Sequence, residues 1–181
     1  IMTMRLPTFY VPKNTTKRTM YETMKNLQNF SILMPNTGSS QISFFVINEL
    51  NKLCKSHPEI DAIVFYENAH RNCMPANFAT MQMSEAWGHD GPVIATSFST
   101  AHKLADFPSE KKFFYVWDLE WIRGGNNIRQ YERYLPIYAD KSLELIARSD
   151  SHKKAIENAF NRRVNHVISD FHISEILEIL Q

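Results

Sequence analysis

Long hydrophobic runs, cysteine and glycine are all scarce in this sequence of 181 residues. The apolar runs, such as Phe44–Ile47 and Phe113–Trp117, are far shorter than the roughly 20 residues that a membrane-spanning helix needs. Residues 1–10 contain no apolar core of a signal peptide. Two cysteines, Cys54 and Cys73, are too few for a disulfide framework and favour reduced thiols. We therefore expect a soluble, cytoplasmic protein with no transmembrane segment.

An excess of charge is also absent, because 20 Lys and Arg against 19 Asp and Glu leave a net charge of +1. Without a basic field, we expect no nucleic-acid partner. The five glycines form neither the G-x-G-x-x-G nor the G-K-[ST] phosphate-binding pattern, so we predict no dinucleotide or ATP cofactor. His70 and Cys73 have the spacing of metal ligands, but no second pair completes a tetrahedral site, and we predict no metal.

The sequence does contain short apolar runs that alternate with helical patterns. The predicted strands are Phe30–Met34, Asp61–Tyr66, Pro92–Thr96, Phe113–Trp117, Leu143–Ala147 and Val164–Ile168. The first predicted helix begins near Ser39 or Ser40 and ends at His57-Pro58. Further helices are predicted over 77–87, 100–105, 128–138, 150–160 and 173–180. Such alternation is typical of an α/β domain whose parallel sheet is covered on both faces. We predict a three-layer domain with a mainly parallel sheet of about six strands over 28–181, preceded by an arm with a short helix over 1–27.

Polar residues follow the predicted strands at their carboxyl ends, where open parallel sheets bind ligands. The candidate site residues there are Asn36, Gly38, Ser39, Glu67, His70, Trp117, Asp118, Glu120, Trp121 and Ser149. The turn around Gly38 could present backbone N–H groups to an anion. The alternative is an ordinary strand-to-helix turn with a serine cap.

The segment from Trp117 to Trp121 has two carboxylates, Asp118 and Glu120, between two tryptophans. In a functional interpretation, the indole rings stack on the apolar face of a sugar and the carboxylates accept its hydroxyl hydrogens. In a structural interpretation, both tryptophans belong to the core and both carboxylates are solvated. The sequence leaves both interpretations open.

The second half of the chain resembles the N-terminal half of GT-B glycosyltransferases, especially family-4-like enzymes of the rhamnosyltransferase type. Phe113–Trp121 is similar to their "yfvQDyE" stretch, with Trp117 at the position of Gln. Leu145–Lys154 looks like their "iiavSe..kk.l" strand and helix cap, and Val167–Phe171 occupies the place of "vipNgvD". Between them, Tyr131–Pro136 corresponds to a helix with aromatic residues. The resemblance covers roughly residues 28–172.

This resemblance implies a Rossmann-like domain that binds the acceptor while a nucleotide sugar, bound by a further C-terminal domain, donates the sugar. Asp118 and Glu120 are then the candidate catalytic residues, Asp118 as the base for the attacking hydroxyl. The other candidate residues above hold the glycan, and a retaining reaction is suspected. Because the donor half of the cleft is not expected within these residues, we expect the isolated chain not to transfer sugar at an enzymatic rate.

Two alternatives from other classes remain. One is a non-catalytic binding or assembly module with the same fold, because a fold does not determine function. The other is a small-molecule hydrolase that uses Asp118 with His89 or His102. If a second, C-terminal domain is missing, the apolar stripe of the last helix, which includes Ile176 and Leu177, must pack on the sheet or on a second copy in a homodimer. We predict packing within the chain.

Overall fold

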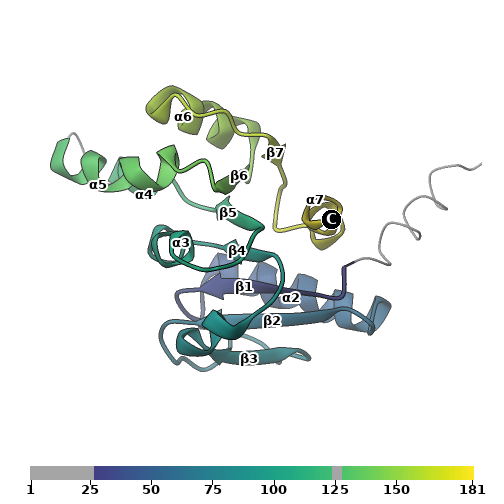
Figure 1. Ribbon diagram of the computed structural model, residues 1–181. Coiled ribbons are helices and arrows are strands. Elements are labelled where there is room, and N and C mark those ends of the chain that lie inside the picture. Colours follow the sequence, from purple (N-terminus) through teal and green to yellow (C-terminus); the bar gives the residue numbers. More distant parts are fainter. Residues whose placement is uncertain (1–26, 124–127) are drawn as a thin grey trace, which may run out of the picture.

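The computed structural model describes residues 27–123 and 128–181, which form one seven-stranded sheet (Figure 1). The strands are β1 (Asn29–Met34), β2 (Asp61–Tyr66), β3 (Ala79–Gln82), β4 (Val93–Ala95), β5 (Lys112–Val116), β6 (Leu143–Ala147) and β7 (His166–Val167). Their order is β3-β2-β1-β4-β5-β6-β7, and each neighbouring pair is parallel. The predicted α/β, Rossmann-like fold is therefore confirmed, with seven strands against the predicted six or so.

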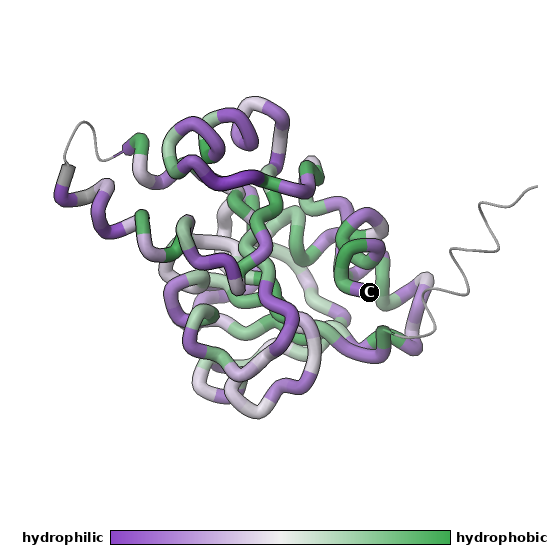
Figure 2. The backbone as a smooth tube through the Cα atoms, turned by 45° about the horizontal axis from the view of Figure 1, so that its top comes forward, coloured by the Kyte–Doolittle hydropathy of each residue, from purple (hydrophilic) through white to green (hydrophobic). Residues whose placement is uncertain are grey.

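Helices cover both faces of this sheet. They are α2 (Gln41–Ser56), the 3-10 helix η2 (Met83–Gly88), α3 (Phe98–Ala105), α4 (Glu120–Arg123), α5 (Ile128–Ala139), α6 (Asp150–Phe160) and α7 (Ile173–Leu180). The core that includes α2 and α7 lies on one face, and the core that includes η2, α3, α5 and α6 lies on the other. Hydrophobic stretches gather at the centre of the molecule and hydrophilic stretches lie outside (Figure 2).

Alternating side chains along each strand divide the apolar residues between these two cores. In β5, Phe113 and Tyr115 belong to the core under α2 and α7, whereas Phe114 and Val116 belong to the core under α3, α5 and α6. All four side chains are almost fully buried. Central strands of this kind are apolar at every position because both faces are covered, and this is why the sequence predicted them well.

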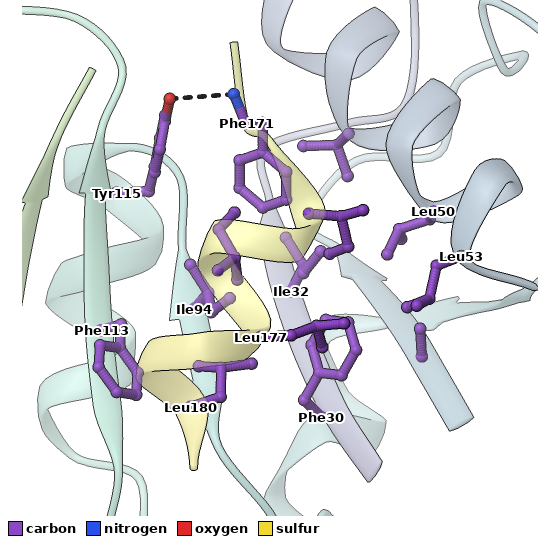
Figure 3. Packing of buried hydrophobic residues seen from close by; sticks show 14 of the residues in the cluster. Phe30, Ile32, Leu50, Leu53, Ile94, Phe113, Tyr115, Phe171, Leu177 and Leu180 are labelled. Atoms are coloured by element: carbon purple, nitrogen blue, oxygen red, sulfur yellow. Dashed lines mark hydrogen bonds between the residues drawn. The ribbon is translucent and has the colours of Figure 1, made fainter. Parts of the chain in front are cut away.

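The last helix, α7, packs within the chain as predicted. Its four apolar residues, Ile173, Ile176, Leu177 and Leu180, are all buried. Figure 3 shows the helix lying across β1, β4 and β5, with Leu177 near Phe30. The buried carboxylate of Glu49 on α2 accepts a hydrogen bond from the Ile173 N–H (3.3 Å) and so meets the first turn of α7. Together these contacts cover the sheet face that α2 leaves open.

The prediction of a helix over 77–87 is wrong. This segment forms the edge strand β3, which pairs with β2 from Ile63 to Tyr66, followed by η2. Its sequence, ATMQ, has no apolar run because three of the four residues are exposed at the edge. The strand is defined by backbone pairing with β2, which local sequence does not reveal. The short helix predicted over Tyr21–Leu27 lies almost entirely outside the described residues.

All loops that follow the carboxyl ends of the strands open on one edge of the sheet, because the strands are parallel. The order of strands reverses between β1 and β4, and this point is where ligands bind in open α/β sheets. The loops after β1 and β4 flank it directly, and the loops after β2 and β5 lie one strand further out. A ligand site is therefore expected at this carboxyl edge of the sheet.

Candidate functional site

The turn after β1 is closed by contacts within the chain. Asn36 Oδ1 accepts a hydrogen bond from the Gly38 N–H (2.9 Å), and the Asn36 carbonyl accepts one from the Ser43 hydroxyl (3.1 Å). A Cβ added to Gly38 would lie 3.3 Å from the Cβ of His70, so only glycine fits beneath this side chain without displacement. Ser40, and not the exposed Ser39, is the N-cap of α2. The predicted residues Asn36, Gly38 and His70 are thus brought together.

The long loop after β2 is attached to this turn by hydrogen bonds. The Thr37 hydroxyl donates to Asn72 Oδ1 (2.6 Å), and the Cys73 N–H donates to the Thr37 carbonyl (2.9 Å). Asn51 on α2 bonds both the Pro75 carbonyl (2.7 Å) and the Asn77 N–H (2.8 Å). The loop that carries Glu67 and His70 therefore has a defined place beside the switch point of the sheet.

Glu67 lies between a hydroxyl and an ammonium group from α3. Its Oε2 accepts a hydrogen bond from the Ser99 hydroxyl (3.1 Å), and its Oε1 lies 2.9 Å from Lys103 Nζ. The carboxylate side chain is only 13% exposed, whereas Ser99 and Lys103 are exposed. This arrangement holds the Glu67 carboxyl group one strand from the switch point, with the Ser99 hydroxyl already bonded to it.

Glu120 occupies the other side of the α3 N-terminus. Its Oε1 accepts a hydrogen bond from the Phe98 N–H (2.9 Å), the first amide of the helix. Burial raises the pKa of Glu120, whereas the Phe98 hydrogen bond lowers it, Asp118 raises it and Arg123 and Arg133 lower it. The candidate residue Glu120 thus acts as a cap on α3 and also holds a half-buried carboxyl group at the rim.

Asp118 lies in an ion pair with Arg123, at 2.5 Å between Oδ2 and Nη2. The side chain of Asp118 is about a third exposed and that of Arg123 is largely exposed. Such pairs near solvent contribute little to stability, roughly 0–1 kcal/mol. Asp118 is therefore a partly exposed carboxylate of the rim whose partner in the chain is Arg123.

The two tryptophans of this segment belong to opposite cores and do not flank one site. Trp117 is 9% exposed and packs with Tyr115 and Phe45, while Trp121 is 8% exposed and packs with Tyr138 and Phe160. The Arg148 guanidinium lies over the Trp117 ring, 4.2 Å from its centroid. For both indoles the geometry favours the structural interpretation, and little ring surface remains for a sugar.

Ser149 lies farther along the same edge. It is the N-cap of α6, and its hydroxyl bonds the His152 N–H (3.2 Å) and meets His152 Nδ1 (2.9 Å). Burial lowers the pKa of His152, and the charge of Arg148 lowers it further. Because β6 is three strands away from β1 at about 5 Å a strand, Ser149 is roughly 15 Å from the Asn36 turn.

The sequence did not predict that Ser99 and Lys103 would contact Glu67. Ser99 and Lys103 are separated from Glu67 by more than thirty positions and meet it only because β2 and β4 are both neighbours of β1. Their spacing of four places both on one face of α3. Because both residues follow a predicted strand, this spacing was the feature of the sequence that could have indicated a polar helix face at the rim.

Three cavities lie at the opposite, amino edge of the sheet. One of about 450 Å³ is lined by His89, Asp90 and Ser109, among others, and shares Asp90 and Lys111 with a second of about 370 Å³. The third, about 540 Å³, lies beside Cys54 and Ile63. His89 is therefore at the wrong end of the sheet to act with Asp118, which argues against a hydrolase built on that pair.

Among the described residues, no three His, Cys, Asp or Glu side chains gather as a metal site. In the same parts of the chain, none of the helices is long and apolar enough to cross a membrane. The sequence matches no protein-family model and no curated protein, and the structure matches no solved structure. The fold thus defines a Rossmann-like α/β domain whose carboxyl edge carries the polar side chains of the candidate site.

Proposed function

We propose that this chain is an acceptor-binding domain of a glycosyltransferase, which holds a sugar hydroxyl at the carboxyl edge between β1 and β4. The observation that carries the proposal is the position of Glu67, a largely buried carboxylate one strand from the switch point that already accepts a hydrogen bond from the Ser99 hydroxyl. A carboxylate can accept several hydrogen bonds from hydroxyl groups. Lys103, 2.9 Å from Oε1, orients this carboxylate.

Glu67 and Asp118 are the candidates for the proton acceptor of the attacking hydroxyl. In the proposed transfer, the acceptor oxygen loses its proton to a carboxylate and bonds the anomeric carbon of a nucleotide sugar. The bond from that carbon to the phosphate oxygen breaks, and the nucleoside diphosphate leaves. The donor would be held by a second domain or a second copy. Glu67 is favoured over Asp118 because its side chain is less exposed, 13% against 34%.

A non-catalytic binding module is the second candidate function. It is favoured by the degree to which the polar groups of the rim already bond one another: Glu67 with Ser99, Glu120 with the Phe98 N–H, and Asp118 with Arg123. A binding module needs the same hydroxyl-accepting carboxylates but no free proton acceptor. The two functions therefore share the site and differ only in turnover.

Thermal unfolding in the presence of neutral sugars tests the proposal. A ligand at ten times its Kd stabilises the folded chain by about 1.4 kcal/mol, which raises Tm by roughly 3–6 °C for a domain of this size. We expect at least one of glucose, galactose, mannose, rhamnose and N-acetylglucosamine to raise Tm, and the Glu67→Gln variant to lose most of that rise. The control variant Glu110→Gln, an exposed carboxyl at the amino edge, should keep it. An unchanged rise in Glu67→Gln contradicts the assignment.

Turnover separates the two functions. We expect wild-type protein, supplied with a nucleotide sugar and the acceptor identified by Tm, to form product only if the donor site is also provided. Asp118→Asn should then bind acceptor more tightly than Glu67→Gln does, because Asp118 is already paired with Arg123, whereas Glu67→Gln should lose both binding and turnover. Binding without product under every donor condition favours the non-catalytic module.

A further inference from the structure

The start of α3, at the switch point, is a position where many α/β proteins bind phosphate. Helix N-termini attract anions because their first N–H groups are free and the helix dipole is positive there. In this chain the Phe98 N–H donates to the Glu120 carboxylate at 2.9 Å, and the Thr100 N–H donates to the Ser97 hydroxyl at 3.2 Å. A carboxylate of the chain itself therefore occupies the anion position of this helix.

The glycine turn after β1 is filled in a similar way. The Gly38 N–H donates to Asn36 Oδ1, and the Cβ of His70 lies 3.3 Å from the place of a Cβ on Gly38. At the next helix start, the Ser43 N–H donates to the Ser40 hydroxyl (3.2 Å). In dinucleotide-binding folds a glycine at this turn lets the backbone approach a pyrophosphate, and here the same space holds an imidazole.

Two of the cations near the switch point are held in ion pairs, and a third, Arg133, lies over the Phe98 ring, 5.6 Å from its centroid. Lys103 pairs with Glu67, and Arg123 pairs with Asp118. A phosphate that displaced either pair would also approach the Glu120 carboxylate, which already holds the Phe98 N–H. A neutral hydroxyl meets no such obstacle. It can take the place of the Ser99 hydroxyl at Glu67, so that one hydrogen bond is exchanged for another.

From these three observations we propose that the switch-point site takes neutral, hydroxyl-rich ligands and excludes phosphate-bearing ones, with Glu120 acting as a built-in anion that fills the phosphate position. This inference rests on the proposed sugar-binding function and names its substrate class. It predicts that a phosphate site appears only when the Phe98 N–H loses its acceptor on residue 120, and that the wild-type protein has none.

Thermal unfolding with inorganic phosphate tests the exclusion without knowledge of the sugar. We expect 10 mM phosphate, compared with chloride at equal ionic strength, to leave the Tm of the wild-type protein within about 1 °C. The Glu120→Ala variant, which frees the Phe98 N–H, should gain a rise of at least about 3 °C. Glu120→Gln is the matched control, because its amide oxygen still accepts the Phe98 hydrogen bond, and it should show no gain. Circular dichroism of both variants checks that the fold is retained.

A phosphate-dependent rise in wild-type protein that Glu120→Ala does not enlarge overturns the inference. So does the absence of any gain in a folded Glu120→Ala. A second arm compares the neutral sugar that binds with its 6-phosphate: stronger binding of the phosphorylated sugar, lost in Glu67→Gln, overturns the inference but leaves the sugar-binding function standing. No binding of either sugar contradicts the proposed function itself, and with it the inference.

Discussion

Single residues at the rim combine structural and chemical roles, and Glu120 is the clearest case. Its carboxylate caps α3 while lying half-buried beside Asp118. Because burial raises its pKa, the folded chain keeps a proton that the unfolded chain has already released. Stability therefore falls as pH rises from the ordinary pKa of a glutamate to the raised pKa of Glu120.

The Glu120→Gln variant removes this titration and keeps an acceptor for the Phe98 N–H. We expect its stability relative to wild type to increase as pH rises from about 4 to about 7, because only the wild-type protein carries the cost of a half-buried charge at neutral pH. Urea unfolding at several pH values measures this. A constant difference between the two proteins across that range would contradict the account, and Glu110→Gln provides the control for a carboxyl exposed to solvent.

Tyr115 is a second residue with a definite structural role. Its hydroxyl donates to the Ile168 carbonyl (2.6 Å) and accepts from the Phe171 N–H (3.1 Å), and burial raises its pKa to about 12. Figure 3 shows the bond between Tyr115 and Phe171. The two bonds hold the turn in which Asp170 and Phe171 adopt left-handed backbone angles. The sequence indicated a buried strand at Tyr115 but not this partner, which lies more than fifty positions away.

Tyr115→Phe leaves the Ile168 carbonyl and the Phe171 N–H without this partner in a buried place. We expect a loss of about 1–3 kcal/mol in the free energy of unfolding. Chemical denaturation with an unchanged m-value measures it. Tyr66→Phe, at a half-buried position at the end of β2, is the control. An equal effect in the two variants would show that the turn does not depend on the Tyr115 hydroxyl.

At the scale of elements, the central strands were predictable and the edge was not. The runs Asp61–Tyr66 and Leu143–Ala147 match β2 and β6 residue for residue, because strands covered on both faces are mostly apolar. The edge strand β3 has no such pattern and depends on pairing with β2. The short α4 was also not predicted. It has only four residues and begins inside the Trp117–Trp121 segment.

The helix α7 gives a prediction at the same scale. Leu177 is 3% exposed in the core beneath α2 and α7. Leu177→Asp should cost about 3–5 kcal/mol and unfold much of the chain, because it buries an unpaired charge. Ile122→Asp, at a 57% exposed position on α4, should change stability by less than about 0.5 kcal/mol. A folded Leu177→Asp that only dissociates a dimer would show that the stripe serves a second copy instead.

At the scale of the whole molecule, the parallel sheet decides which residues meet. The sequence correctly predicted a polar rim, since loops after parallel strands share one edge, and the turn around Asn36 and Gly38 lies beside the loop of Glu67 and His70 as expected. It did not predict that Trp117 and Trp121 would be divided between two cores, because that depends on where the chain turns after β5. Nor could it predict that Glu120 would reach the start of α3.

The whole domain offers a ligand two ends, the carboxyl rim with its carboxylates and the amino edge with its three cavities. Chemical-shift mapping of the backbone amides with a neutral sugar that binds tests directly which end is the site. The account predicts shifts at Gly38, Glu67 and Ser99 that Glu67→Gln abolishes, and no shifts at His89 or Lys111. Shifts confined to His89 and Lys111, unaffected by Glu67→Gln, would contradict it.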